Sequence, residues 1–162
     1  MRPGSCALRA LLGAGMVAGM TAGCGTSAQP PISSALATNY VAIATPANKK
    51  LDRSFDELED EARAQDIDLA HASAVLTTIA ATERRFDRDL LALRLPGRMA
   101  STAKELVRVN EARANLTVQA STATSGDSLR RYQSELDAMN VPVETQVKAL
   151  RTSLGLPPPD TD

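Results

Sequence analysis

Four runs of apolar residues at helical spacing most constrain what this chain can fold into. The first run is Leu51, Phe55, Leu58 and Ala62. The second is Leu69, Ala72, Leu76, Ile79, Glu83, Phe86, Leu90 and Leu93. The third is Met99, Leu106, Val109, Leu116 and Ala120, and the fourth is Leu129, Tyr132, Leu136, Met139, Val143, Val147, Leu150 and Leu154. Steps of three and four place each run on one face of an α-helix, and Glu83 is the only polar member.

Start and stop signals separate these runs. Asp66 and Asp68 are N-cap candidates for the second helix, which is expected to end at Leu95-Pro96-Gly97. The polar stretch 121–128 ends the third helix, and the fourth starts near Asp127. Gly155 suits the left-handed position after the fourth helix, with Leu156 folding back before three prolines.

These features predict an all-α fold, an antiparallel up-and-down bundle of about four helices over residues 34–156. Aromatic residues make up only 2% of the chain, so the core is expected to be aliphatic and alanine-rich. Residues 157–162 are predicted to form a disordered tail. Pro142 is expected to bend the fourth helix near Met139.

The beginning of the first helix is ambiguous. Ile32, Leu36, Tyr40 and Ile43 also recur at helical spacing. Pro46 then either kinks this segment or restarts a helix with Thr45 as its N-cap. The sequence leaves open whether residues 34–45 pack on the bundle.

The first twenty-three residues have the layout of a bacterial export signal. Arg2 and Arg9 precede an apolar, glycine-rich run, and small residues then lead to Cys24 in Thr21-Ala22-Gly23-Cys24. This layout resembles the bacterial lipobox, although Thr21 stands where that motif usually has Leu. The resemblance implies cleavage between Gly23 and Cys24 and acylation of Cys24 by chains such as palmitate.

Two other interpretations of this leader remain. It could be an ordinary secretory signal with an incidental cysteine, or an uncleaved membrane helix, for which the apolar run is short and rich in glycine. In the lipoprotein interpretation, residues 1–23 are the signal peptide and residues 24–33 form a flexible tether. Cys24 would then be the only cysteine left, so no disulfide within the chain is expected.

Charge excludes one class of partner. Removing the leader changes the formal net charge from −1 to about −3, because Arg2 and Arg9 are lost and no acidic residue is. We therefore expect no nucleic-acid partner. The alanine-rich helical segment with its L-G-L-P-P-P ending resembles uncharacterised helical lipoproteins of actinobacteria over roughly residues 35–159. That resemblance supports fold and compartment and implies no catalytic residue.

Candidates for catalysis are few. His71 is the only histidine, and Asp68-x-x-His71 matches only half of a bundle metal motif, which needs ligands from several helices. We expect His71 to be a helix-surface or packing residue, and the acidic run 56–61 to be a solvated helix face. The sequence therefore predicts no enzyme, no metal and no cofactor other than the covalent lipid on Cys24.

Basic residues are expected to gather at the end of the bundle where the tether enters. The set predicted to face the membrane is Lys49, Lys50, Arg53, Arg94, Arg98, Lys148 and Arg151. Some of these, such as Lys148 and Arg151, could instead complement the dipole at a helix C-terminus.

Taken with the lipobox, these features predict a lipoprotein anchored to the outer face of the cytoplasmic membrane. Its function is expected to be non-enzymatic, as an interaction or scaffolding module for another envelope protein. The alternative is a carrier that binds a small apolar ligand between helices, near Pro142, Met139 and Tyr132.

Overall fold

Each of the four predicted runs lies in one helix, except that Leu93 and Leu154 are the C-cap residues that follow their helices. The computed structural model describes residues 32–64 and 66–159, which form α1 (Ile32–Arg63), α2 (Leu69–Ala92), α3 (Gly97–Ala120) and α4 (Gly126–Ser153) and no β-strand. The predicted all-α bundle is therefore confirmed. Cys24, the leader before it and the rest of the segment up to residue 31 lie outside the described residues.

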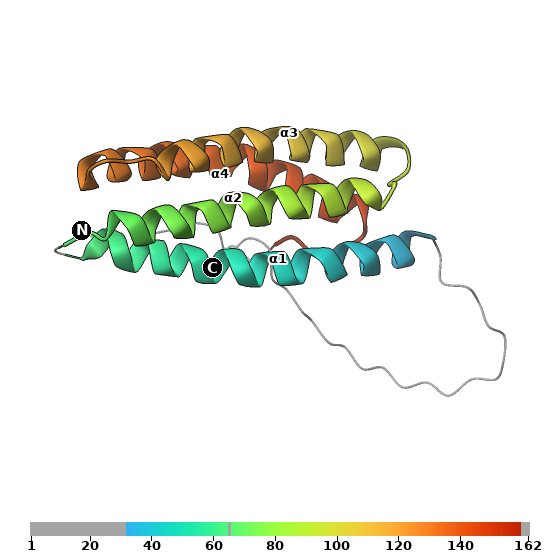
Figure 1. The fold of residues 1–162 in the computed structure, drawn as a ribbon. Coiled ribbons are helices and arrows are strands. Elements are labelled where there is room, and N and C mark those ends of the chain that lie inside the picture. Colours follow the sequence, from blue (N-terminus) through green and yellow to red (C-terminus); the bar gives the residue numbers. More distant parts are fainter. Residues whose placement is uncertain (1–31, 65, 160–162) are drawn as a thin grey trace, which may run out of the picture.

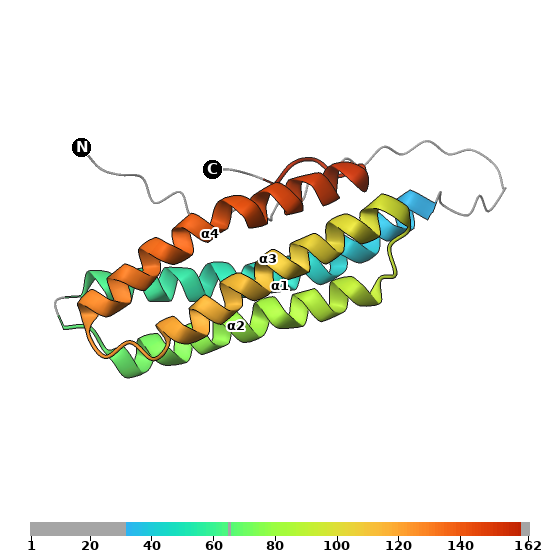
Figure 2. The same cartoon turned by 90° about the horizontal axis from the view of Figure 1, so that it is seen from above.

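Consecutive helices run antiparallel and pack against one another, α1 on α2, α2 on α3 and α3 on α4 (Figure 1). α1 and α4 contact each other much less, and α4 is inclined to α1 (Figure 2). The start of α1, the α2–α3 connection and the end of α4 share one end of the molecule, hereafter the N-terminal end of the bundle. The end of α1, the start of α2 and the α3–α4 connection form the opposite end.

The helix termini follow the predicted signals. The Asp68 carboxylate accepts hydrogen bonds from the backbone N–H groups of Ala70 and His71, and so caps α2. Ser125 caps α4 in the same way. Beyond α4, Gly155 has φ of +70°, and the Leu156 N–H donates to the Arg151 carbonyl, which closes the predicted C-terminal motif.

The proline in α1 does not interrupt the helix. α1 begins at Ile32 and continues through Pro46, so the segment before this proline belongs to the bundle. Tyr40 and Ala44 are buried there, at 0% and 2% exposure. α4 likewise continues through Pro142 as one helix.

The core consists of two apolar clusters stacked along the bundle. The cluster nearer the N-terminal end contains Tyr40, Ala44, Phe86, Leu90, Leu95, Ala103, Leu106, Val109, Val143, Val147, Leu150 and Leu154. The other contains Leu51, Leu58, Ala72, Val75, Leu76, Ile79, Ala120, Leu129 and Leu136. Both are mainly aliphatic, as predicted. Among the described residues, no helix has both the length and the hydropathy needed to cross a membrane.

Candidate functional site: a polar layer in the bundle core

Six buried polar side chains separate the two apolar clusters. This polar layer draws on all four helices and consists of Asn48 of α1, Glu83 and Asp87 of α2, Asn110 and Arg113 of α3, and Asn140 of α4. Burying a polar or charged group costs free energy unless it is paired. The layer is therefore the part of the interior whose residue types apolar packing does not explain.

An ion pair between α2 and α3 lies at its centre. Arg113 Nη2 is 2.7 Å from Glu83 Oε1, and both side chains are almost completely buried, at 6% and 1% exposure. Attraction between the two opposite charges holds this pair together in the interior. Glu83 is the residue that the sequence marks as the only polar member of the α2 core face.

Two hydrogen bonds extend the layer on either side of this pair. Arg113 Nη1 donates to Asn140 Oδ1 at 3.1 Å, which joins α3 to α4. Asn110 Nδ2 donates to Asp87 Oδ1 at 2.8 Å, which joins α3 to α2 a second time. α3 is therefore fixed to both of its neighbours through side chains that only one axial register brings together.

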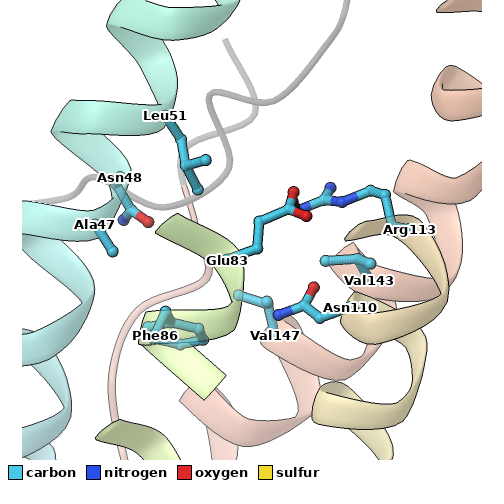
Figure 3. Close-up of a pocket in the computed structure, with 9 residues that line it drawn as sticks. All are labelled: Ala47, Asn48, Leu51, Glu83, Phe86, Asn110, Arg113, Val143 and Val147. Carbon is cyan, nitrogen blue, oxygen red and sulfur yellow. Dashed lines mark ion pairs between the residues drawn. The ribbon is translucent and has the colours of Figure 1, made fainter. Parts of the chain in front are cut away.

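A small cavity adjoins the layer between α1 and α4 (Figure 3). It is lined by Ala47, Asn48, Leu51, Glu83, Phe86, Asn110, Arg113, Val143 and Val147, and its volume is about 20 Å³. That volume holds roughly one water molecule. Neither the oxygen nor the nitrogen of the Asn48 amide has a hydrogen-bond partner among the described residues.

Burial favours the protonated form of both carboxyl groups in the layer. It raises the pKa of Glu83 above its ordinary value, because the loss of hydration outweighs the opposing attraction of Arg113. Burial likewise raises the pKa of Asp87 from 3.8 to about 7. The hydrogen bond from Asn110 and the charge of Arg113 oppose this rise, whereas the negative charges of Glu83 and Glu111 add to it.

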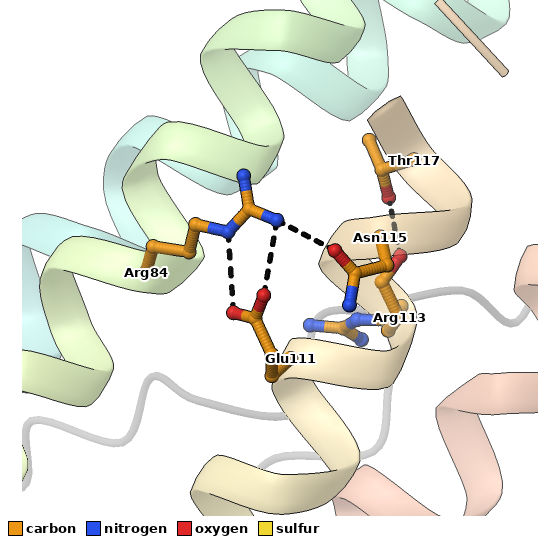
Figure 4. Close-up of polar contacts among 5 residues, drawn as sticks. All are labelled: Arg84, Glu111, Arg113, Asn115 and Thr117. Atoms are coloured by element: carbon orange, nitrogen blue, oxygen red, sulfur yellow. Dashed lines mark hydrogen bonds and ion pairs between the residues drawn. The ribbon is translucent and has the colours of Figure 1, made fainter. Parts of the chain in front are cut away.

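A second, more exposed link between α2 and α3 lies beside the layer (Figure 4). The Arg84 guanidinium donates two hydrogen bonds to the Glu111 carboxylate, at 3.1 and 3.0 Å, and a third, at 2.8 Å, to Asn115 Oδ1. The two pairs have opposite arrangements of charge. α2 supplies the cation in this exposed pair, whereas it supplies the anion in the buried pair. Exposed pairs contribute only about 0.2–1 kcal/mol, so this link adds mainly to the alignment of the two helices.

Arg151 ties the C-terminal segment to the N-terminal end of the bundle. Its Nε donates to the Pro157 carbonyl at 2.7 Å, and the Pro159 side chain is buried. Residues 157–159, predicted to belong to the disordered tail, therefore lie on the bundle. Burial raises the pKa of Tyr40 to about 12, while the nearby Arg151 guanidinium opposes the rise.

The layer has the chemistry of a structural core. Its carboxylates point into an interior with room for about one water, and the layer contains no hydroxyl or thiol nucleophile beside a base. Within the described part of the chain, no group of three His, Cys, Asp or Glu side chains is placed to hold a metal. His71 is exposed in the first turn of α2, as predicted.

Only some of the basic residues predicted to face the membrane lie at the N-terminal end of the bundle. Arg94, Arg98 and Lys148 are exposed at the N-terminal end of the bundle. Lys49, Lys50 and Arg53 are exposed midway along α1, next to the polar layer, so their predicted position was wrong. The reason is that α1 starts at Ile32 rather than at Pro46, which places Lys49 about 25 Å from the helix start.

Arg151 also needs correction, because it is buried at 3% exposure and bound to Pro157 rather than presented to solvent. The cavity differs from expectation as well: Val143 and Val147 line it, whereas Met139 and Tyr132 do not. Gly23 and Cys24, the predicted cleavage and lipidation residues, lie outside the described residues.

Comparison with known proteins gives no relative for this chain: no family model, curated protein or solved structure matches it.

Proposed function

We propose that this protein is a lipoprotein of the cell envelope, anchored through Cys24 to the outer face of the cytoplasmic membrane. Its helical bundle acts as a non-enzymatic interaction or scaffolding module for another envelope component. The anchor is supported by the basic, apolar and small-residue leader that ends at Cys24. The role of the bundle is supported by the small size of the cavity beside its polar layer.

The size of this cavity is the observation that carries the choice between a ligand bound inside the bundle and a partner bound to its outer surface. The cavity beside the polar layer holds about one water, whereas pockets for small ligands measure roughly 300–1,000 Å³. Its lining includes the charged pair of Glu83 and Arg113, which an apolar ligand would leave in contact with hydrocarbon. Both features disfavour the carrier alternative.

The test is mass spectrometry of the native protein extracted from membranes, under denaturing and then native conditions. We expect a chain that starts at Cys24 and carries two or three acyl groups, with no further lipid retained under native conditions. A Cys24→Ala variant is the control, and it should lack the acyl mass and leave the membrane fraction.

The opposite results are equally informative. A mature chain without acyl mass would refute the anchor and leave a secreted or periplasmic protein. A stoichiometric lipid retained by the native bundle, beyond the covalent chains, would refute the interaction module in favour of the carrier.

A further inference from the structure

Charge is separated along the long axis of the bundle. The described residues at the N-terminal end, 32–40, 88–104 and 146–159, contain one acidic residue, Asp89. The same ranges present five exposed cations: Arg88, Arg94, Arg98, Lys104 and Lys148. At the opposite end, ranges 56–64, 66–71 and 115–131 contain eight acidic residues: Asp56, Glu57, Glu59, Asp60, Glu61, Asp66, Asp68 and Asp127.

The two ends also differ in how their charges are compensated. Each of the three arginines at the acidic end, Arg63, Arg130 and Arg131, forms an ion pair on its own helix. None of the five exposed cations at the N-terminal end is paired with a carboxylate of residues 32–64 or 66–159. The lone Asp89 there is already engaged by Arg85. These five cations are therefore available to an external anion.

Helix dipoles do not account for the whole set. Lys148 lies in the last two turns of α4, where a cation is favoured. Arg98, in contrast, is in the first turn of α3, where the dipole disfavours a positive charge and Pro96 supplies no side-chain cap. Arg94 is held in the left-handed region, with φ of +50°, and projects from the short α2–α3 connection.

The position of Cys24 brings this end of the bundle to a membrane. Ile32, the first residue of α1, lies eight positions after Cys24, with seven residues between them. Even fully extended, eight residues span only about 27 Å. If Cys24 is acylated, as the proposed function holds, the end of the bundle that meets the lipid surface is the one with the unpaired cations.

We propose that the N-terminal end of the bundle binds anionic lipid headgroups through Arg94, Arg98 and Lys148, with Arg88 and Lys104 around them. The anchor and the cations together would hold the bundle upright, with its acidic end away from the membrane. This inference rests on the proposed function for its biological setting, but the binding itself can be measured without the anchor.

The experiment uses residues 25–162, which retain both apolar clusters of the described residues, because these clusters and the side chains packed on them lie between Leu36 and Leu156. Binding to vesicles of phosphatidylglycerol and phosphatidylcholine is measured by co-sedimentation at low salt. The test variant carries Arg94→Gln, Arg98→Gln and Lys148→Gln. The matched control carries Lys49→Gln, Lys50→Gln and Arg53→Gln, the same change of charge midway along α1. Circular dichroism checks that all three proteins are folded.

We expect the parent chain to bind the anionic vesicles and the test variant to bind about 100-fold more weakly, since each cation near an anionic surface contributes about a factor of five. The control triple should bind within a few-fold of the parent. Raising the salt should release the parent chain, a readout that needs no variant.

Absence of binding by the parent at low salt would overturn the proposal, and so would an equal loss in both triple variants. These outcomes are separate from the mass measurement on Cys24. A chain without acyl groups that still binds vesicles through its N-terminal end would refute the proposed anchor alone.

Discussion

Arg113 is the residue on which the polar layer depends, because it contacts both Glu83 and Asn140. A buried ion pair is weak support for stability, since the cost of removing two charges from water offsets most of their attraction. Removing one partner is nevertheless costly, because the other charge is left buried and alone. We therefore interpret the layer as a device that selects one register of α3 against α2 and α4.

The same layer shows what residue-level reasoning can find. Glu83 was visible in the sequence because it interrupts an apolar series at helical spacing. Asn140 also interrupts an apolar series, between Leu136 and Val143. Arg113 lies at helical spacing from Val109 and Leu116. Their pairing could not be predicted, because it depends on the axial offset between helices, which periodicity within one helix does not contain.

The raised pKa of Asp87 predicts a stability that depends on pH. In the folded protein the Asp87 carboxyl binds its proton more tightly than in the unfolded chain, so its contribution to stability is greatest at low pH and is lost as the pH rises from about 4 to about 7. Asp87→Asn removes this titration and keeps an acceptor for Asn110. We expect it to stabilise the protein at pH 8, by on the order of 2 kcal/mol, and to flatten the dependence between pH 5 and 8.

Urea unfolding at several pH values measures this effect. Asp89→Asn, the same chemical change on the less buried side of α2, is the control and should leave the pH dependence nearly intact. A parent protein that becomes more stable as the pH rises from 5 to 8 would contradict the assignment. Glu83, whose pKa burial also raises, contributes in the same direction and would keep part of the slope in the Asp87→Asn variant.

At the scale of elements, the short-range signals predicted the helix ends well. Asp68, Ser125 and Gly155 act through bonds to backbone groups within a few residues, so their effect can be read locally. The start of α1 could not be settled this way. A proline inside a helix is unfavourable on its own, and only the burial of Tyr40 and Ala44 against other helices offsets that cost.

This account of α1 makes a prediction about Pro46. The side chain is exposed, and its ring nitrogen cannot donate the helical hydrogen bond to the Ala42 carbonyl. We expect Pro46→Ala to raise the free energy of unfolding by about 1–3 kcal/mol. Pro96→Ala, at the N-cap of α3 and outside any helix interior, should give no such gain. Urea unfolding followed by circular dichroism compares the two, and a loss of stability in Pro46→Ala would show that α1 needs its proline.

On the scale of the whole molecule, the polar layer divides one bundle into two apolar cores. Each core draws on all four helices, and the two meet at the small cavity, which Leu51 lines from one core and Phe86, Val143 and Val147 line from the other. Energetic coupling between substitutions is carried mainly by direct contact or a shared cavity. Substitutions in the two cores should therefore act almost independently when at least one of the two sites lies away from this cavity.

Three identical changes test this division. Val75→Ala lies in one cluster and Val147→Ala in the other, and each should cost about 1–3 kcal/mol. We expect their double variant to equal the sum within about 0.5 kcal/mol. Val143→Ala combined with Val147→Ala, which share a cluster and the same cavity, should deviate from additivity by more. Strong coupling between Val75 and Val147 would show that the layer does not separate the cores.

A core divided in this way changes how the sequence can drift over time. Apolar residues in one half can be exchanged, enlarged or reduced without compensating changes in the other half. Less freedom remains at the five polar positions that pair with one another, because removing one side chain leaves its buried partner unsatisfied; these are Glu83, Asp87, Asn110, Arg113 and Asn140. Descendants of this chain should therefore differ freely within each apolar half, while each of these five positions keeps a side chain that can pair with its partner.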